Sequence, residues 1–162
     1  LQSANYVWQA RGPFNVGGCT RVIGIDVSNE NVLVAAGVGG GGIWRSTNKG
    51  QTWTRATAPQ AIDLWSLAQD KRPGKQNIWY GGGGAVLKRG IPTGFQGMVK
   101  STDGGLSWQP LVSTINNPKF SIVRAIAIRH TNTQQDEIYA ATNSGIFRSL
   151  DGGTTWNQAV EV

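Results

Sequence analysis

The sequence is poor in the residues on which disulfides, metal centres and catalytic triads depend. Its 162 residues include one cysteine, Cys19, and one histidine, His130. A lone cysteine forms no intrachain disulfide and no thiolate cluster, and a lone histidine near a turn gives little basis for a triad or a metal site. We therefore expect no metal ion and no cofactor, with Cys19 as a small buried thiol and His130 exposed.

Charge and long apolar runs are scarce as well. Charged residues make up 15% of the chain, whereas glycine occurs 23 times. This balance favours short strands joined by tight turns over helices with many ion pairs. The longest apolar runs, such as residues 32–36, are too short to span a bilayer, and residues 1–3 do not open a signal peptide. We expect no transmembrane segment, and an export signal that was removed or never present.

The basic excess of the chain permits anionic partners, either nucleic acid or acidic glycans. The net charge is +6 and the pI is near 9.9, but the basic residues are scattered. The densest group, Lys71, Arg72 and Lys75, flanks residues 73–74 (Pro-Gly), which is typical of a solvated hairpin tip. We therefore predict no nucleic-acid binding and place this group on the surface.

An eight-residue motif occurs three times, with the pattern Ser-x-Asp/Asn-x-Gly-x-Thr/Ser-Trp. Its copies end at Trp53, Trp108 and Trp156, which are 55 and 48 residues apart. Such a period fits four short strands with their turns. The first strands are expected at 20–27, 64–68 and 122–128, the second at 32–37, 78–81 and 138–142, and the third at 42–46, 97–101 and 145–149. A fourth strand is expected to begin at each tryptophan.

The residue types of the motif point to a structural role. A short Asp or Asn side chain bonds the backbone N–H groups of its own turn, glycine permits positive φ, and each tryptophan buries a large ring between sheets. The residues expected to act in this way are Ser46, Asn48, Gly50 and Trp53, then Ser101, Asp103, Gly105 and Trp108, and finally Ser149, Asp151, Gly153 and Trp156.

The three copies resemble the Asp-box, or BNR, repeats of sialidases, family 74 glycoside hydrolases, sortilin-type receptors and photosystem assembly propellers. The resemblance covers nearly the whole chain and implies an all-β fold, a β-propeller of four-stranded antiparallel blades whose boxes lie opposite the ligand face. It does not decide the function, because such repeats occur in enzymes, receptors and scaffolds alike. Residues 8–18 resemble the opening segment of large secreted bacterial propellers, which implies a secreted or cell-surface protein.

The repeat divides the chain into an N-terminal segment, 1–18, and three blades, 19–57, 58–112 and 113–162. Residues 6–9 are predicted to form an outer strand that closes the ring. Three blades are fewer than the usual four to eight. We therefore predict a partial propeller whose open faces are covered by further blades of the same chain or by a protein partner.

The ligand face is expected where the second strand of each blade connects to the third and where one blade connects to the next. The long connection 82–96 of blade two lies there and contributes Lys88, Arg89 and Phe95 as binding candidates, although a surface flap is the simpler interpretation. The inner strands contribute Trp65 and Arg124. Trp65 is a candidate for sugar stacking, with packing between blades as the favoured alternative, and Arg124 is equally suited to line the central channel.

The sequence gives little support for a catalytic site on this face. Glycoside hydrolysis requires two carboxyl groups flanking the scissile bond, yet on this face only Asp63 is acidic. The resemblance to family 74 would place the catalytic aspartate at about Gly37, and the Phe/Tyr-Arg-Ile-Pro motif of sialidases is absent. The tetraglycine stretches 39–42 and 81–84 lack the lysine and helix of a phosphate loop.

We therefore predict a non-catalytic segment of a secreted or cell-surface bacterial propeller that acts as an interaction scaffold or exported cargo domain. The alternative is a glycan-binding or glycoside hydrolase propeller whose catalytic carboxylates lie in missing blades. A third hypothesis is an assembly factor that docks a folded protein through a basic patch.

Overall fold

The computed structural model describes residues 19–38, 41–58, 62–84, 86–88, 91–93, 97–131 and 134–160. These residues form strands, turns and two short 3-10 helices, η1 (Val112–Thr114) and η2 (Pro118–Phe120). No helix in this part of the chain is long and apolar enough to cross a membrane. The protein is all-β, as its composition predicts.

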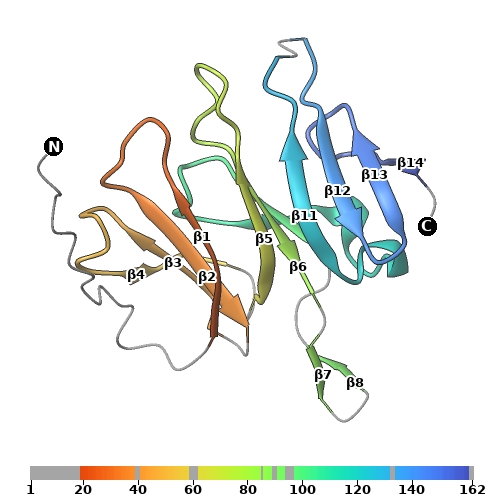
Figure 1. Ribbon diagram of the computed structural model, residues 1–162, viewed down its shortest axis with the longest axis horizontal. Coiled ribbons are helices and arrows are strands. Elements are labelled where there is room, and N and C mark those ends of the chain that lie inside the picture. The colour runs from red at the N-terminus through yellow and green to blue at the C-terminus, as the bar shows by residue number, and fades with distance from the viewer. Residues whose placement is uncertain are drawn as a thin grey trace, which may run out of the picture.

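The strands form three four-stranded antiparallel sheets in which neighbours along the chain are neighbours in space (Figure 1). The first sheet contains β1 (Cys19–Ile25), β2 (Leu33–Val38), β3 (Ile43–Ser46) and β4 (Thr54–Arg55). The second contains β5 (Leu64–Gln69), β6 (Trp79–Gly83), β9 (Met98–Ser101) and β10 (Gln109–Pro110). The third contains β11 (Val123–Ile128), β12 (Ile138–Thr142), β13 (Gly145–Ser149) and β14 (Asn157–Val160).

The second sheet carries an insertion between β6 and β9. Its described part is a separate two-stranded hairpin of β7 (Val86–Lys88) and β8 (Ile91–Thr93). Figure 1 shows this hairpin projecting beyond the sheets, at the end where β5 and β11 begin. The long connection predicted at residues 82–96 therefore has regular structure of its own.

The sheets stack as blades, with β1, β5 and β11 as neighbouring inner strands. Two apolar clusters fill the spaces between the sheets. The first, built around Val34, Leu64, Trp79 and Trp108, lies between blades one and two, and the second, built around Tyr80, Met98, Phe120, Val123 and Phe147, lies between blades two and three. Burial of such side chains, worth about 1.5–3 kcal/mol for each large aliphatic or aromatic one, holds the blades together. The described residues thus form three neighbouring blades of a β-propeller.

The repeated motif folds identically in all three blades. Its serine hydroxyl accepts a hydrogen bond from the backbone N–H of the motif glycine, at 2.8 Å for Gly50, 2.9 Å for Gly105 and 2.8 Å for Gly153. The same hydroxyl donates to the side chain of Asn48, Asp103 or Asp151. All three glycines have positive φ, a conformation that favours glycine. In each blade, the motif side chains thus bond the backbone of their own turn.

The three motif tryptophans differ in burial. Trp108 is fully buried, whereas Trp53 and Trp156 are half-buried. Trp108 packs into the cluster between blades one and two, and Trp156 packs on Phe120 with their ring centroids 5.2 Å apart. Each ring thus packs toward the preceding blade, and Trp53 has no preceding blade among the described residues. The prediction of rings buried between sheets holds fully only for the middle blade.

Candidate functional site

Each inner strand has a β-bulge near its start, and the three bulges occur at the same position of the repeat. The pairing register shifts between Thr20 and Val22 in β1, between Leu64 and Ser66 in β5, and between Val123 and Ala125 in β11. A bulge leaves one residue out of the ladder and redirects its side chain. The residues redirected in this way are Arg21, Trp65 and Arg124.

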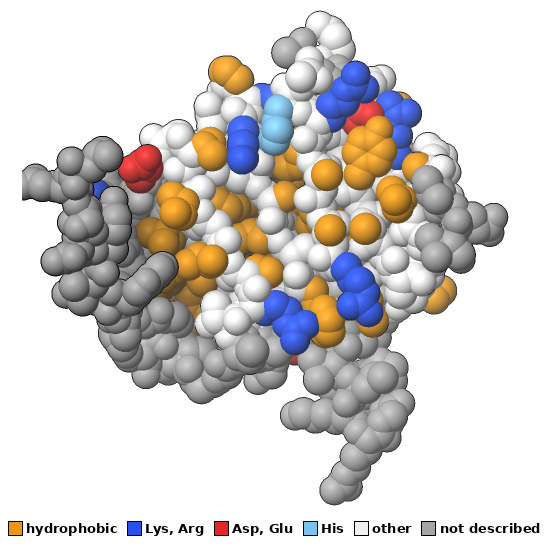
Figure 2. Space-filling view, in the orientation of Figure 1, with side chains coloured by type: hydrophobic (Ala, Val, Ile, Leu, Met, Phe, Trp, Pro, Cys, Tyr) orange, Lys and Arg blue, Asp and Glu red, His pale blue; other side chains and the backbone are white. Residues whose placement is uncertain are grey.

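These three side chains meet, and we call them the Arg-Trp-Arg cluster. The guanidinium carbon of Arg21 lies over the Trp65 ring, 3.9 Å from its centroid, and that of Arg124 lies 5.6 Å from the same ring. Both distances are within the range of cation–π attraction. Both arginines are exposed, so their outward N–H groups are available to a ligand. In Figure 2, Lys and Arg side chains gather where β5 and β11 begin.

Trp65 itself is tightly confined. A Cβ atom at Gly84 would lie 2.4 Å from the indole Nε1, so only glycine fits beside the ring. Nε1 is buried and has no hydrogen-bond partner among the described residues. A buried, unpaired donor costs roughly 1–3 kcal/mol.

Of the other predicted binding candidates, only Asp63 has a side chain that the structure describes. Asp63 is only two residues from Trp65, but its side chain is 4% exposed. The predictions for Arg89 and Phe95 lie outside the described residues, as does the side chain of Lys88. The buried thiol predicted for Cys19 and the ring-closing strand at residues 6–9 also lie outside what the structure describes.

The described carboxylates offer no catalytic pair near the cluster. Apart from Asp63, they belong to the repeated motifs or to the turn between the first and second strands of each blade, at the opposite end of the inner strands. Glu137, the most buried of them, is 0% exposed and is held by Arg129, Arg148 and the hydroxyl of Tyr139. The described residues also contain no group of three His, Cys, Asp or Glu side chains that would suit a metal ion.

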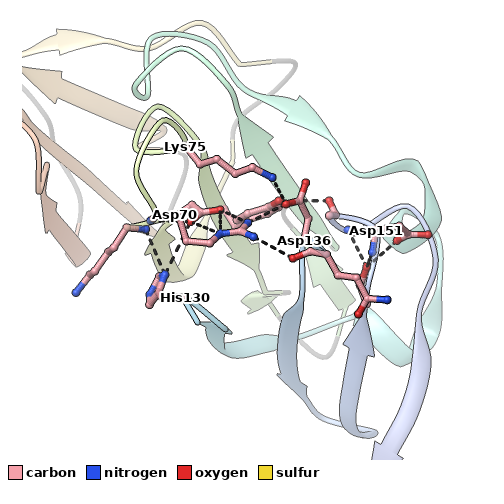
Figure 3. A network of polar contacts seen from close by, with 12 residues as sticks. Asp70, Lys75, His130, Asp136 and Asp151 are labelled. Atoms are coloured by element: carbon pink, nitrogen blue, oxygen red, sulfur yellow. Dashed lines mark hydrogen bonds and ion pairs between the residues drawn. The ribbon is translucent and has the colours of Figure 1, made fainter. Parts of the chain in front are cut away.

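The motif end of the molecule carries a second charged cluster, shown in Figure 3, which corrects one prediction. Arg72, expected on a solvated hairpin tip, is 5% exposed and bonds Asp70 at 2.5 Å and Asp136 at 2.8 Å. Lys75 also pairs with Asp136. Because Asp70 belongs to blade two and Asp136 to blade three, Arg72 links the two blades and is unavailable to a ligand.

The pKa shifts in this network follow from its contacts. Burial by itself would raise the pKa of Asp70, but the hydrogen bonds from Arg72 outweigh it and hold that pKa below its usual value. Hydrogen bonding from Lys75 and then from Arg72 lowers the pKa of Asp136. Both carboxylates therefore stay ionised at neutral pH, and neither is suited to act as a general acid.

The position of the Arg-Trp-Arg cluster was partly visible in the sequence. Trp65 and Arg124 were predicted as candidates, but Arg21 was not. Aligning the three inner strands places Arg21, Trp65 and Arg124 at the same position of the repeat. That alignment is the signal that would have found Arg21. The cation–π contact itself depends on the bulges, which have no signature in the sequence.

Comparison with solved structures supports the propeller fold. The chain is similar to an ancestral GH74 enzyme (TM-score 0.69, 21% identity, 87% of this chain and 18% of that one). It is also similar to the GH74 xyloglucanase from Xanthomonas campestris (0.65, 19%, 87% and 23%) and to YCF48 bound to a D1 peptide (0.59, 18%, 88% and 41%).

These likenesses establish the fold and no more, since all three identities are below 25%. The chain spans 18–41% of the length of these structures. No protein-family model matches the chain, and no curated protein matches it.

Proposed function

We propose that the chain belongs to a secreted or cell-surface bacterial β-propeller and acts there as a non-catalytic interaction scaffold, or as a domain of an exported cargo protein, by binding an acidic segment of a protein partner. The observation that carries this proposal is the Arg-Trp-Arg cluster, because two exposed guanidinium groups converge on one ring. Guanidinium groups form strong, directional hydrogen bonds with carboxylates.

Among the residues that the structure describes, no exposed acid lies near the cluster, which supports this proposal over an enzyme. Asp63 is buried, and Gly37, where the family 74 resemblance would place a catalytic aspartate, is a buried glycine. The alternative, a glycan-binding or glycoside hydrolase propeller with its carboxylates in further blades, draws on the GH74 neighbours. Against it, the Trp65 ring is occupied by Arg21 at 3.9 Å and is not free to stack on a sugar.

We further propose that additional blades of the same chain cover the open faces of blades one and three. A repeated contact between blades supports this. The basic residue before each motif serine reaches the motif backbone of the next blade: Arg45 donates to the Gly104 carbonyl at 2.9 Å, and Lys100 donates to the Gly152 carbonyl at 3.5 Å. Arg148 holds the same position in blade three and bonds Glu137 instead.

The open side of blade one also has the character of a blade interface. Ile23, Ile25 and Val27 on or just after β1 are 63%, 59% and 48% exposed. A further blade would bury these side chains as the described blades bury one another. In this proposal the blades are 19–57, 58–112 and 113–162, and the repeated motifs are Asp-boxes.

Binding of a labelled acidic peptide, measured by fluorescence anisotropy beside a glycan array, tests the proposed function. We expect the peptide to bind and its glutamine analogue to bind at least tenfold more weakly, since a hydrogen bond to a charged group contributes roughly 1.5–3 kcal/mol. Replacing Arg21 and Arg124 by Gln should abolish the preference, whereas Arg55→Gln, an exposed arginine on β4, should not. Saturable glycan binding with no peptide binding would contradict the proposal.

A further inference from the structure

The three inner strands present one continuous surface, which we call the inner face. The Arg-Trp-Arg cluster lies at the end where β1, β5 and β11 begin. At the other end is a cleft of about 450 Å³, with apolar side chains that include Leu67, Ile126 and Ile128. Figure 2 shows basic side chains at both ends of this face, the histidine at the cleft end, and hydrophobic side chains between them.

The polar groups around the cleft divide into those that are satisfied and those that are available. Gln69 is satisfied, because its Oε1 accepts from the Val27 N–H at 3.0 Å and its Nε2 donates to the Gln76 carbonyl at 2.7 Å. His130 accepts the Lys71 backbone N–H at Nδ1, at 3.3 Å. The other nitrogen, Nε2, therefore carries the proton when the ring is neutral. That N–H and the exposed Lys71 ammonium are two donors at the rim of the cleft.

One carboxylate near the cleft, Asp70, lies 3.8 Å from His130 Nδ1, which leaves the Nε2 N–H and the Lys71 ammonium as donors that no carboxylate engages among the described residues. Asp26 is 4% exposed and accepts hydrogen bonds from Ser28 within its own turn, and Asp70 is 1% exposed and is held by Arg72. Among the described residues, no ion pair engages the Lys71 side chain. In the part of the chain that the structure describes, the inner face therefore has a cationic group at each end and no exposed carboxylate between them.

We infer that the inner face binds an extended peptide segment of the partner, with one acidic group at the Arg-Trp-Arg cluster and a second at Lys71 and His130. This inference rests on the proposed function and deepens it. Trp65 and Lys71 are six residues apart along β5 and the turn after it, a span of roughly 20 Å at about 3.3 Å per residue. An extended ligand of similar length places its acidic groups about six residues apart.

The middle of the inner face suits such a segment. Ala127 on β11 borders the cleft, and its small, exposed side chain leaves room for a peptide backbone beside the strands. Small apolar side chains of the ligand would meet the apolar lining of the cleft. A second copy of the chain is a poorer occupant, because it would bring a face of the same positive charge against this one.

The affinities of two peptides test this inference separately from the proposed function on which it rests. The probes are a labelled peptide with two glutamates six residues apart, separated by alternating alanine and valine, and the same peptide with one glutamate replaced by glutamine. We expect the two-acid peptide to bind about tenfold more tightly. The double substitution Lys71→Gln with His130→Gln should remove that difference and leave the one-acid peptide unchanged. Lys49→Gln, an exposed lysine on the first motif turn, is the matched control.

Two results would overturn the inference while leaving the proposed function standing. One is an equal affinity for the two peptides, or a difference that survives the Lys71→Gln and His130→Gln substitutions, while Arg21→Gln still weakens binding. The other is a dimer in light scattering whose formation competes with the two-acid peptide, which would assign the inner face to a second copy. A tenfold preference that also persists when the glutamates are only three residues apart would contradict the extended geometry.

Discussion

The two charged clusters of this molecule use arginine in opposite ways. At the motif end, Arg72 is 5% exposed and is bound by two carboxylates from different blades. At the other end of the inner strands, Arg21 and Arg124 are exposed and lie over a tryptophan ring. Basic residues paired with buried acids stabilise the junction between blades, whereas basic residues that lack such partners remain available for binding.

Removing Arg72 should have the largest effect on stability. The Arg72→Met variant leaves Asp70, which is 1% exposed, as a buried charge that has lost its main partner, and breaking a buried pair in this way costs about 3–5 kcal/mol. The free energy of unfolding from urea denaturation measures the loss. A loss as small as that of Arg21→Met would show that the two clusters do not differ as we describe.

The middle blade should depend on its motif tryptophan more than the first blade does. Trp108→Ala removes a fully buried ring, for which a loss of about 3–5 kcal/mol is typical. Trp53→Ala removes a half-buried ring and should cost clearly less, since the indole is already partly in water. Thermal unfolding followed by circular dichroism compares the two variants. Equal losses would contradict the assignment of Trp53 to a blade edge.

Lowering the pH should reduce the stability that the third motif contributes. Hydrogen bonds from Thr155 lower the pKa of Asp151 to about 2, below its value in the unfolded chain. The ionised carboxylate therefore contributes stability above about pH 4, and this contribution is lost as the pH falls toward 2. Unfolding measured between pH 5 and pH 2 should show a smaller decline in Asp151→Asn than in the unmodified protein. An identical decline would argue against this contribution.

The smallest effect on stability is expected at the Arg-Trp-Arg cluster. Arg21→Gln removes an exposed side chain whose cation–π contact contributes about 0.5–1 kcal/mol, so the free energy of unfolding should change by no more than that. Binding of an acidic peptide should nevertheless fall about tenfold. A large loss of stability would instead assign Arg21 to the structural core of the blade.

The repeat made most of the fold predictable. The spacing of the motifs and the alternation before them located the inner strands, and the hydrogen bonds of Ser101 and Asp103 follow directly from their residue types. The burial of Arg72 was not predictable, because its partner Asp136 is 64 residues away in the chain and the contact does not recur between blades one and two. Local composition around residues 73–74 favoured a turn, and a turn is present, but the next blade covers it.

The candidate site was predictable in position but not in chemistry. The inner strands placed Trp65 and Arg124 on the expected face, whereas the contact between them requires bulges in separate blades to bring side chains together. Sequence reasoning made Trp65 a candidate for sugar stacking, with packing between blades as the favoured alternative. In the structure, Arg21 lies over that ring. This contact is the basis for proposing an anionic ligand rather than a neutral sugar.

The most direct test of an inner face that binds an acidic segment is a ¹H–¹⁵N spectrum of the protein titrated with the two-acid peptide. The Trp65 indole N–H signal can be identified among the seven tryptophans by its absence in Trp65→Phe. We predict that this signal moves and saturates with the peptide, while the Trp53 signal stays in place. Binding that leaves the Trp65 signal unchanged would contradict the account.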